Sequence, residues 1–272
     1  MLDVTSASVR AYFDRELARG RRLLPDTATV SGLGTYRKYR EAVELMASPA
    51  VSTVLDVGCN RGSIEFLFHD LQPAKANRTQ VRGIDASSEA IRHARELKLP
   101  MCDFQVNDGP TLPYPSATFD LVVMVEVIEH VLDKERLLRE VSRVLTPSGK
   151  LYLTTPNPEC WPLQMERAVW AGLRTLFRRP DPAKDVFITQ RALDALLASA
   201  GFRAADAPAR FAWPHFFLDF FGWGVLPPLP PKVLYWYQRK CLALLDPARL
   251  PDWVNRRFQW SLVTVLGKSS AA

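Results

Sequence analysis

Short apolar runs alternate with amphipathic segments along most of the chain from residue 51 onward. Runs that are almost wholly apolar predict buried strands, and apolar residues at helical spacing predict the helices between them. The predicted strands are 52–57, 80–85, 103–107, 119–124, 150–154, 202–211 and 259–266. The predicted helices fall near 62–71, 87–97, 132–145 and 190–200. This alternation predicts an α/β fold, a parallel sheet with helices on both faces.

Two further amphipathic runs precede this series. Apolar residues recur at helical spacing over 9–17 and again over 36–46, and a polar, glycine-containing loop over 25–34 separates them. We therefore predict a helical N-terminal cover over residues 1–48 and one large α/β domain over 49–272.

Two inserts interrupt the predicted domain, at 157–188 and at 212–257. Aromatic residues crowd the start of the second insert: Phe211, Trp213, Phe216, Phe217, Phe220, Phe221, Trp223, Tyr235, Trp236 and Tyr237. Four prolines between residues 227 and 231 exclude one continuous helix there. The pattern fits a lid over an apolar acceptor, a face that contacts a membrane, or a hydrophobic plug against the sheet.

Composition and charge narrow the class of protein. The chain is 47% hydrophobic and 24% charged, as in ordinary globular domains, and carries a net charge of +6. That charge suits an anionic partner or simply keeps the protein soluble. The cysteines form no C-x-x-C pair, which argues against a zinc site or a disulfide framework. With no secretory signal and no long apolar run, we expect a cytoplasmic protein, with 212–257 as a peripheral contact at the inner face of the membrane.

A glycine turn follows the first predicted strand. The segment Val54–Ser63 runs from the strand through Gly58 and Gly62 into a helix, and such turns bring backbone N–H groups close to a ligand. The next two strands each end in an acid, Asp85 and Asp108. A carboxylate after the second strand is well placed to bind a ribose diol.

In order and spacing, these elements resemble the class I S-adenosylmethionine-dependent methyltransferases over about residues 50 to 211. The resemblance implies a doubly wound, Rossmann-like, seven-stranded sheet, with the aromatic-rich insert before an antiparallel last strand. It also implies S-adenosylmethionine as cofactor, with these candidate binding residues: Asp56, Gly58, Asn60, Gly62, Asp85, Asp108 and Gly109. Asn60 departs from the family's usual glycine, although asparagine tolerates the left-handed backbone. The acids are open to a second interpretation as capping or turn residues.

The acceptor side is expected after the fourth strand, where Glu126, Glu129 and His130 follow one another. His130 suits a general base, and we take His130 and Glu129 as candidate catalytic residues. The E-x-x-E-H pattern also resembles ubiquinone-biosynthesis O-methyltransferases and small-RNA 2′-O-methyltransferases, where such residues bind a divalent ion. All three side chains are therefore candidate Mg²⁺ ligands. A purely structural role, beginning the next helix, stays open.

These patterns predict O-methylation of a small or lipid-like acceptor, such as a quinone precursor or phenol. The alternatives are a sugar or secondary-metabolite acceptor, an RNA 2′-O-methyltransferase with a metal, and a cofactor-binding partner without turnover. Nucleic acid is the weaker partner class, because basic residues flank the aromatics of 212–257 rather than alternate with them. The RNA enzymes also use a further histidine downstream, and 184–187 contains only Asp185.

Overall fold

The computed structural model describes residues 23–25, 30–160, 164, 187–202, 210–214, 251, 253 and 259–267. Its strands are β1 (Thr53–Val57), β2 (Gln80–Asp85), β3 (Cys102–Val106), β4 (Phe119–Val125), β5 (Leu145–Pro156), β6 (Arg210–Pro214) and β7 (Gln259–Gly267). Its helices are α2 (Val30–Met46), α3 (Ser63–Leu71), α4 (Pro73–Ala76), α5 (Ser88–Glu96), the 3-10 helix η1 (Ile128–His130), α6 (Lys134–Val144) and α8 (Gln190–Ser199).

The strands form one sheet in the order β3-β2-β1-β4-β5-β7-β6. The pairs from β3 through to β5 are parallel, and β7 pairs antiparallel with both β5 and β6. Strand order reverses at β1, since β2 and β3 lie on one side of it and β4 and β5 on the other. In doubly wound folds ligands bind at the carboxyl ends of the strands beside this reversal. The predicted α/β, Rossmann-like architecture is confirmed.

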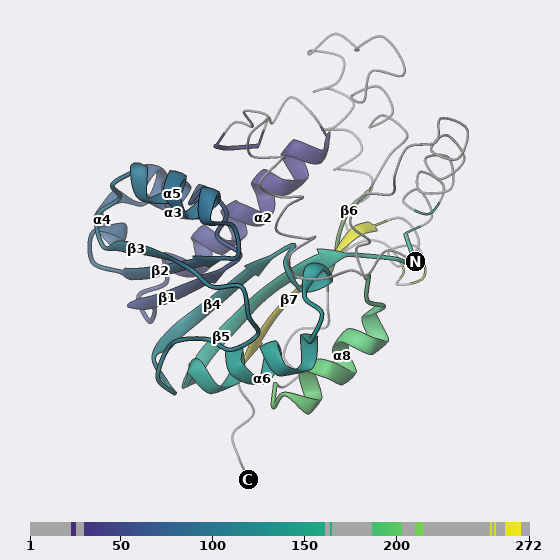
Figure 1. Ribbon diagram of the computed structural model, residues 1–272. Helices are drawn as coiled ribbons and strands as arrows, with labels where there is room; N and C mark the ends of the chain where they lie inside the picture. Colours follow the sequence, from purple (N-terminus) through teal and green to yellow (C-terminus); the bar gives the residue numbers. More distant parts are fainter. Residues whose placement is uncertain are drawn as a thin grey trace, which may run out of the picture.

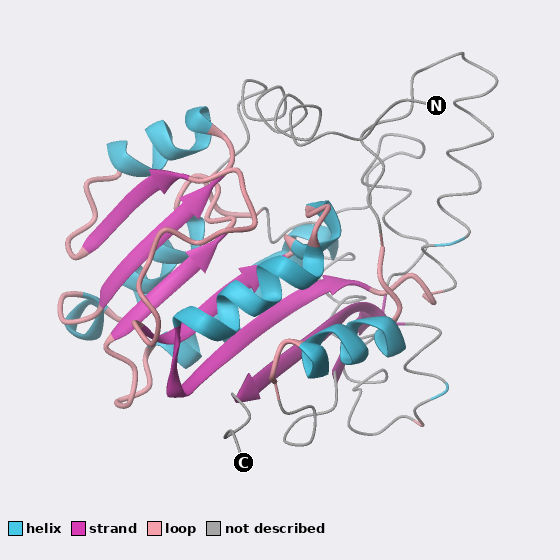
Figure 2. Ribbon diagram, turned by 60° about the horizontal axis from the view of Figure 1, so that its bottom comes forward, coloured by secondary structure: helices cyan, strands magenta, loops and turns pink. Residues whose placement is uncertain are grey.

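Helices cover both faces of the sheet (Figure 1). On β4, Leu121 and Val123 pack in a core beneath α2 and α3, whereas Val122 and Met124 pack in a core beneath α6 and α8. Successive strand residues point to opposite faces, so a strand covered on both faces is apolar throughout. Figure 2 shows α6 and α8 lying across one face. Within the described ranges, no helix is both long enough and apolar enough to cross a membrane.

Three predicted boundaries were wrong. The loop expected over 25–34 is helical from Val30, since each of the two glycines in that stretch costs a helix only about 1 kcal/mol and packing of later turns offsets it. The fifth strand runs from Leu145 to Pro156, because β4 and β7 pair with its two ends. The sixth strand lies at Arg210–Pro214, while Phe202, expected to begin it, is buried in the core beside α8.

Several predictions fall on residues outside the described ranges. The first N-terminal helix, most of the insert at 157–188 and nearly all of 212–257 belong to this group. The predicted division at residue 48 stays a prediction. In the structure, the end of α2 joins the sheet core directly through Ala42, Val43 and Met46.

Candidate functional site

The turn after β1 is held in a left-handed backbone conformation at three positions. Gly58 has φ 78°, Asn60 φ 52° and Gly62 φ 77°. The Gly58 and Cys59 amides donate to the carbonyl of Ile84, at 2.7 and 3.0 Å, so the turn is bound to the end of β2. A Cβ on Gly58 would lie 2.4 Å from Val127 Cγ2. Glycine is therefore required here by both backbone conformation and space, and Asn60 takes the conformation that asparagine tolerates.

Asp85, at the end of β2, supports the same turn. Its Oδ2 accepts from the Asn60 amide at 2.9 Å, and its Oδ1 accepts from the Ser87 amide at 2.8 Å. Each carboxylate oxygen can accept a second hydrogen bond, so a ribose diol can still be bound. The capping interpretation of Asp85 is thus correct as far as it goes, and it does not compete with the cofactor role.

Asp108 and Gly109 lie in the loop that follows β3, beside the end of β2. The Asn107 amide donates to the carbonyl of Asp85 at 2.9 Å. The Asn107 side chain accepts from the Gly109 amide at 3.3 Å and donates to the carbonyl of Thr111 at 3.1 Å. The Gly109 N–H, expected near the adenine ring, therefore has a partner within its own loop.

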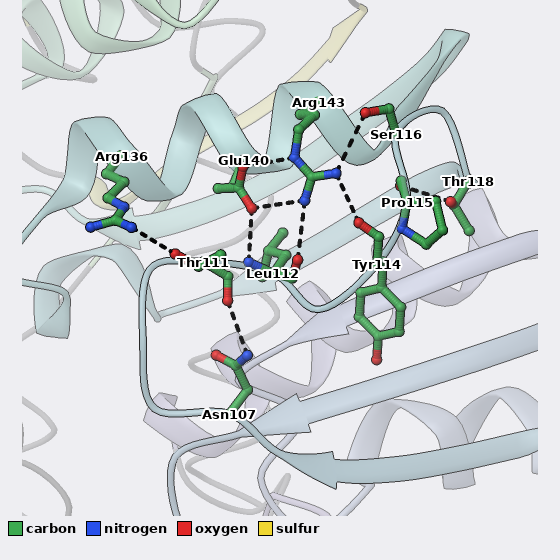
Figure 3. Close-up of polar contacts among 10 residues, drawn as sticks. All are labelled: Asn107, Thr111, Leu112, Tyr114, Pro115, Ser116, Thr118, Arg136, Glu140 and Arg143. Atoms are coloured by element: carbon green, nitrogen blue, oxygen red, sulfur yellow. Dashed lines mark hydrogen bonds and ion pairs between the residues drawn. The ribbon is translucent and has the colours of Figure 1, made fainter.

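Helix α6 anchors this loop from the other side, as Figure 3 shows. Glu140 Oε2 accepts from the Leu112 amide at 2.9 Å. The Arg143 guanidinium donates to the carbonyls of Leu112 at 3.1 Å and Tyr114 at 2.8 Å. Arg136 donates to Thr111 Oγ1 at 3.0 Å. Arg143 and Glu140 also bond to each other, so the loop backbone is held by a charge-assisted network.

Two acids are buried beneath the glycine turn. Asp56 of β1 is 2% exposed and Glu65, in the first turn of α3, is 0% exposed. Burial raises the pKa of Asp56 well above its usual range, and the negative charge of Glu65 raises it further. Burial likewise raises the pKa of Glu65, to about 7. The two side chains are also hydrogen-bonded to each other, which raises the pKa of Asp56 further and opposes the shift of the Glu65 pKa.

The predicted acceptor-side residues follow β4 and are held by α2 and β5. Glu126 has a left-handed backbone, φ 56°, and its Oε1 lies 2.9 Å from Lys38 Nζ and accepts from Thr154 Oγ1 at 3.0 Å. Glu129 Oε2 accepts from Thr155 Oγ1 at 3.0 Å. Burial, then the charge of Glu126, raise the pKa of Glu129 to about 8, while the nearby His130 opposes that shift.

The predicted metal site has no support in the structure. Within the described ranges, no group of three His, Cys, Asp or Glu side chains converges as metal ligands do. The physical reason lies with Glu126, whose carboxylate is already matched by the Lys38 ammonium. We therefore derive no step through Mg²⁺.

Sequence reasoning missed four contributors to this region. Lys38 and Tyr39 were noted only as part of a basic, amphipathic segment, and Glu65 only as part of the third helix. Arg143 lay in a helix predicted for packing alone. The sequence did contain a signal for Glu65, because it lies on the apolar face of a short predicted helix. An acid is rarely buried unless it is paired or functional.

The residues present fit S-adenosylmethionine. Glycines leave the turn without bulky side chains, Asp85 has a carboxylate that suits a diol, and Asp56 has a buried carboxyl beside the turn. The arrangement suits a ligand that carries both a ribose and a cationic group.

Comparisons with known proteins agree with this chemistry. Residues 33–206 match the family model described as a methyltransferase domain. The chain is 33% identical over 172 residues to the ubiquinone biosynthesis O-methyltransferase of Xanthomonas axonopodis pv. citri, covering 61% of this chain and 69% of that protein. It is also 33% identical over 139 residues to the norajmaline N-methyltransferase of Rauvolfia serpentina, covering 47% of this chain and 46% of the plant enzyme.

Among solved structures, one chain of a complex titled as the Haloferax volcanii Trm112 methyltransferase activator with a candidate methyltransferase matches 97% of this chain and 99% of its own length. The TM-score is 0.59 at 18% identity, which shows the shared fold alone. Against curated relatives such as the norajmaline enzyme, the matched region spans less than half of the relative's length.

Proposed function

Because this chain belongs to the S-adenosylmethionine-dependent methyltransferases, we propose that it transfers the methyl group to an oxygen of a small or lipid-like acceptor, with a phenol or quinone precursor as first choice. The single observation that carries the oxygen assignment is the Glu129–His130 pair after β4. Bound S-adenosylmethionine supplies an electrophilic methyl group on a sulfonium. The chain must then hold the acceptor in line and take its hydroxyl proton.

The pair suits proton removal. Glu129 is buried, held by Thr155 Oγ1, and close enough to His130 for their charges to interact. We infer that the His130 imidazole accepts the hydroxyl proton and that Glu129, as a positioning residue, stabilises the imidazolium that results. A carboxyl whose pKa is about 8 is only partly charged at neutral pH, and a charged imidazole beside it favours ionisation.

Contact between Val127 and Gly58 supports a position for this pair close to the candidate cofactor turn. Val127 Cγ2 fills the space that a side chain at residue 58 would need, so the β1 turn and the segment after β4 are in direct contact. The cofactor roles of Asp56, Asp85, Asp108 and Gly109 belong to the same proposal. Asp85 carries the ribose, Asp108 the adenine amine, and the glycine turn the amino-acid end.

Acceptor class is the finer part of the proposal. The oxygen-methylating relative supports a hydroxyl, whereas the norajmaline relative supports an amine. A neutral amine attacks without prior loss of a proton, so a base is less necessary for it. The aromatic segment 212–257, almost all outside the described residues, suits a lid over an apolar acceptor or a face on anionic lipid.

The test uses S-adenosylmethionine labelled on its methyl group, with a catechol, a phenol with a prenyl tail, a tertiary amine and a short RNA as acceptors. We expect label in the phenolic acceptors. In the His130→Ala variant, turnover should fall about 100-fold or more, as expected for loss of a general base. The matched control is His93→Ala, because His93 lies on α5 beside Glu89 and Glu96.

Each outcome has a distinct meaning. Label confined to the amine, with turnover indifferent to His130, would replace oxygen by nitrogen as the acceptor atom. Label in the RNA would support the nucleic-acid alternative. Sedimentation with anionic and neutral vesicles separates a membrane face from a lid, since only the former gives salt-sensitive binding to anionic lipid.

A further inference from the structure

The chain turns sharply at Glu126, where it leaves β4. This residue has a left-handed backbone, φ 56°, which costs a non-glycine residue about 1 to 2 kcal/mol unless its surroundings hold it. Two contacts from β5 hold it: its amide donates to the carbonyl of Thr154 at 3.0 Å, and its carboxylate accepts from the Thr154 hydroxyl at 3.0 Å. Strained residues of this kind gather at active sites, so the contacts that fix Glu126 are candidates for a functional role.

A third contact comes from a buried lysine on α2. Lys38 Nζ lies 2.9 Å from Glu126 Oε1, and the lysine side chain is 5% exposed against 26% for the glutamate. Lysine is almost never buried this far without a partner. The ion pair therefore has an enclosed cation and a partly open carboxylate, so the ammonium fixes an acid that solvent still reaches.

Stability alone does not account for this pair. Desolvation of two charges largely offsets their attraction in a protein interior, and apolar side chains of similar volume are often as stable or more so. Ala42 and Met46, one and two turns after Lys38 on the same face of α2, are buried in an apolar core. An apolar residue at position 38 would continue this face, so the lysine points to a role in placing Glu126.

Helix α2 is itself fastened to the sheet and to the turn after β1. The Tyr152 hydroxyl of β5 lies 3.1 Å from the Lys38 carbonyl and 3.1 Å from Glu41 Oε2. Tyr39, the residue after the lysine, is hydrogen-bonded to the Ser63 side chain at the start of α3. Consecutive residues of one helix thus contact the segment after β4 and the end of the glycine turn.

We propose that Lys38 is a positioning residue for methyl transfer, which holds the turn at Glu126 and through it the segment that carries His130. That segment is short, since Val127 packs on Gly58 and the His130 amide donates to the Val127 carbonyl at 3.0 Å. A shift at Glu126 therefore reaches the imidazole directly, and displacement of a reacting group by about 1 Å can lower a rate about 100-fold. This inference rests on the proposed function, because it assumes that His130 takes part in the transfer.

The first experiment needs no acceptor. Amide hydrogen exchange over 126–130 is compared between wild type and Lys38→Met, which keeps an unbranched apolar side chain and removes the ammonium. We expect exchange over this segment to be about 10-fold faster in Lys38→Met, because the turn opens locally more often. Arg40→Met is the matched control, since Arg40 pairs with Glu44 on the exposed side of the same helix. Exchange over 126–130 should be unchanged in that control.

The second experiment separates turnover from cofactor binding. Methyl transfer from labelled S-adenosylmethionine to the acceptors named above is measured beside calorimetry with S-adenosylhomocysteine. In Lys38→Met, kcat should fall about 10- to 100-fold, while affinity for S-adenosylhomocysteine should change less than about 2-fold. Lys38→Arg retains a cation and should recover part of kcat. The double variant Lys38→Met with Glu126→Gln removes both charges, so its urea midpoint should return toward wild type while kcat stays low.

Each outcome bears on one level of the inference. Unchanged exchange over 126–130 in Lys38→Met would show that the lysine does not hold the turn, and the inference is overturned. Recovery of kcat together with the urea midpoint in the double variant would reduce the ion pair to a structural role and overturn it as well. If wild type labels none of the acceptors while exchange still responds to Lys38→Met, the proposed function fails and the catalytic part of the inference fails with it.

Discussion

Two sets of acids lie at the carboxyl ends of the central strands, and their surroundings are opposite. On the acceptor side, Glu126 has an ammonium 2.9 Å away and a threonine hydroxyl, and Glu129 has another threonine. On the candidate cofactor side, Asp56 and Glu65 are buried beside each other, and the negative charge of Glu65 raises the pKa of Asp56, so this set is unmatched. A buried charge that loses its partner destabilises the folded state, because its desolvation is then uncompensated. The fold therefore supplies a counter-charge to the first set and brings two acids together in the second.

The largest predicted effect on stability comes from removing one partner of the Lys38–Glu126 ion pair. Glu126→Gln leaves the Lys38 ammonium, 5% exposed, without its counter-charge. We expect the free energy of unfolding to fall by about 3 kcal/mol, as for other buried pairs that lose one partner. Urea denaturation measures it. The double variant Lys38→Met with Glu126→Gln should recover most of the loss.

Glu44→Gln provides the control for that prediction, because the Arg40–Glu44 pair on the same helix is exposed. Exposed pairs contribute about 0 to 1 kcal/mol, so little change is expected. Equal effects of Glu126→Gln and Glu44→Gln would show that the Lys38 pair is no more important than a surface contact.

The second largest effect is expected at Gly58, where the turn after β1 contacts Val127 in the segment after β4. Gly58→Ala puts a Cβ 2.4 Å from Val127 Cγ2 at a residue with φ 78°. We expect a loss of about 2 kcal/mol in stability from the left-handed backbone and the clash together, and loss of cofactor binding. Thermal unfolding and calorimetry measure the two. Adding Val127→Ala removes the clash and should restore only part of the stability, since the backbone strain remains.

The unmatched set predicts the pH dependence. Because the pKa of Glu65 rises from 4.5 to about 7 in the folded chain, the folded state binds a proton that the unfolded state releases within that window. Unfolding free energy contributed by this group therefore decreases as pH rises from about 4.5 through 7. Glu65→Gln should be more stable than wild type at pH 8 by about 1 to 3 kcal/mol, and by less at pH 5.

Chemical denaturation at those two pH values is the measurement. A stability gain that is the same at both pH values would show that Glu65 is not the titrating group.

The smallest effect concerns the loop held by α6. Arg143→Ala removes the hydrogen bonds to the carbonyls of Leu112 and Tyr114 (Figure 3) and leaves the candidate cofactor residues Asp108 and Gly109 unsubstituted. We expect about 1 kcal/mol less stability, a several-fold weaker affinity for S-adenosylhomocysteine, and faster amide exchange over 109–116. Arg139→Ala is matched to it, because Arg139 pairs with Glu135 on the exposed side of α6. Equal exchange in the two variants would contradict the anchoring role.

Local pattern was enough for the architecture and for locating the elements that carry the candidate cofactor residues. Apolar runs and glycines lie consecutively in the chain, so the β1 turn, Asp85 and Asp108 could be found without knowing what they contact. Local pattern was insufficient for the candidate acceptor residues that follow β4. The Glu126, Glu129 and His130 cluster predicted a metal, and the structure places Lys38 against Glu126 instead.

The sequence by itself determined which segments form strands and helices, their alternation and the left-handed turn at Gly58, because these depend on neighbours a few residues apart. Only the tertiary structure decided which acids are matched. Lys38 lies 88 residues before Glu126, and Glu65 approaches Asp56 only when α3 packs back on β1. Burial and charge depend on atoms brought together from distant parts of the chain, and no local pattern contains that information.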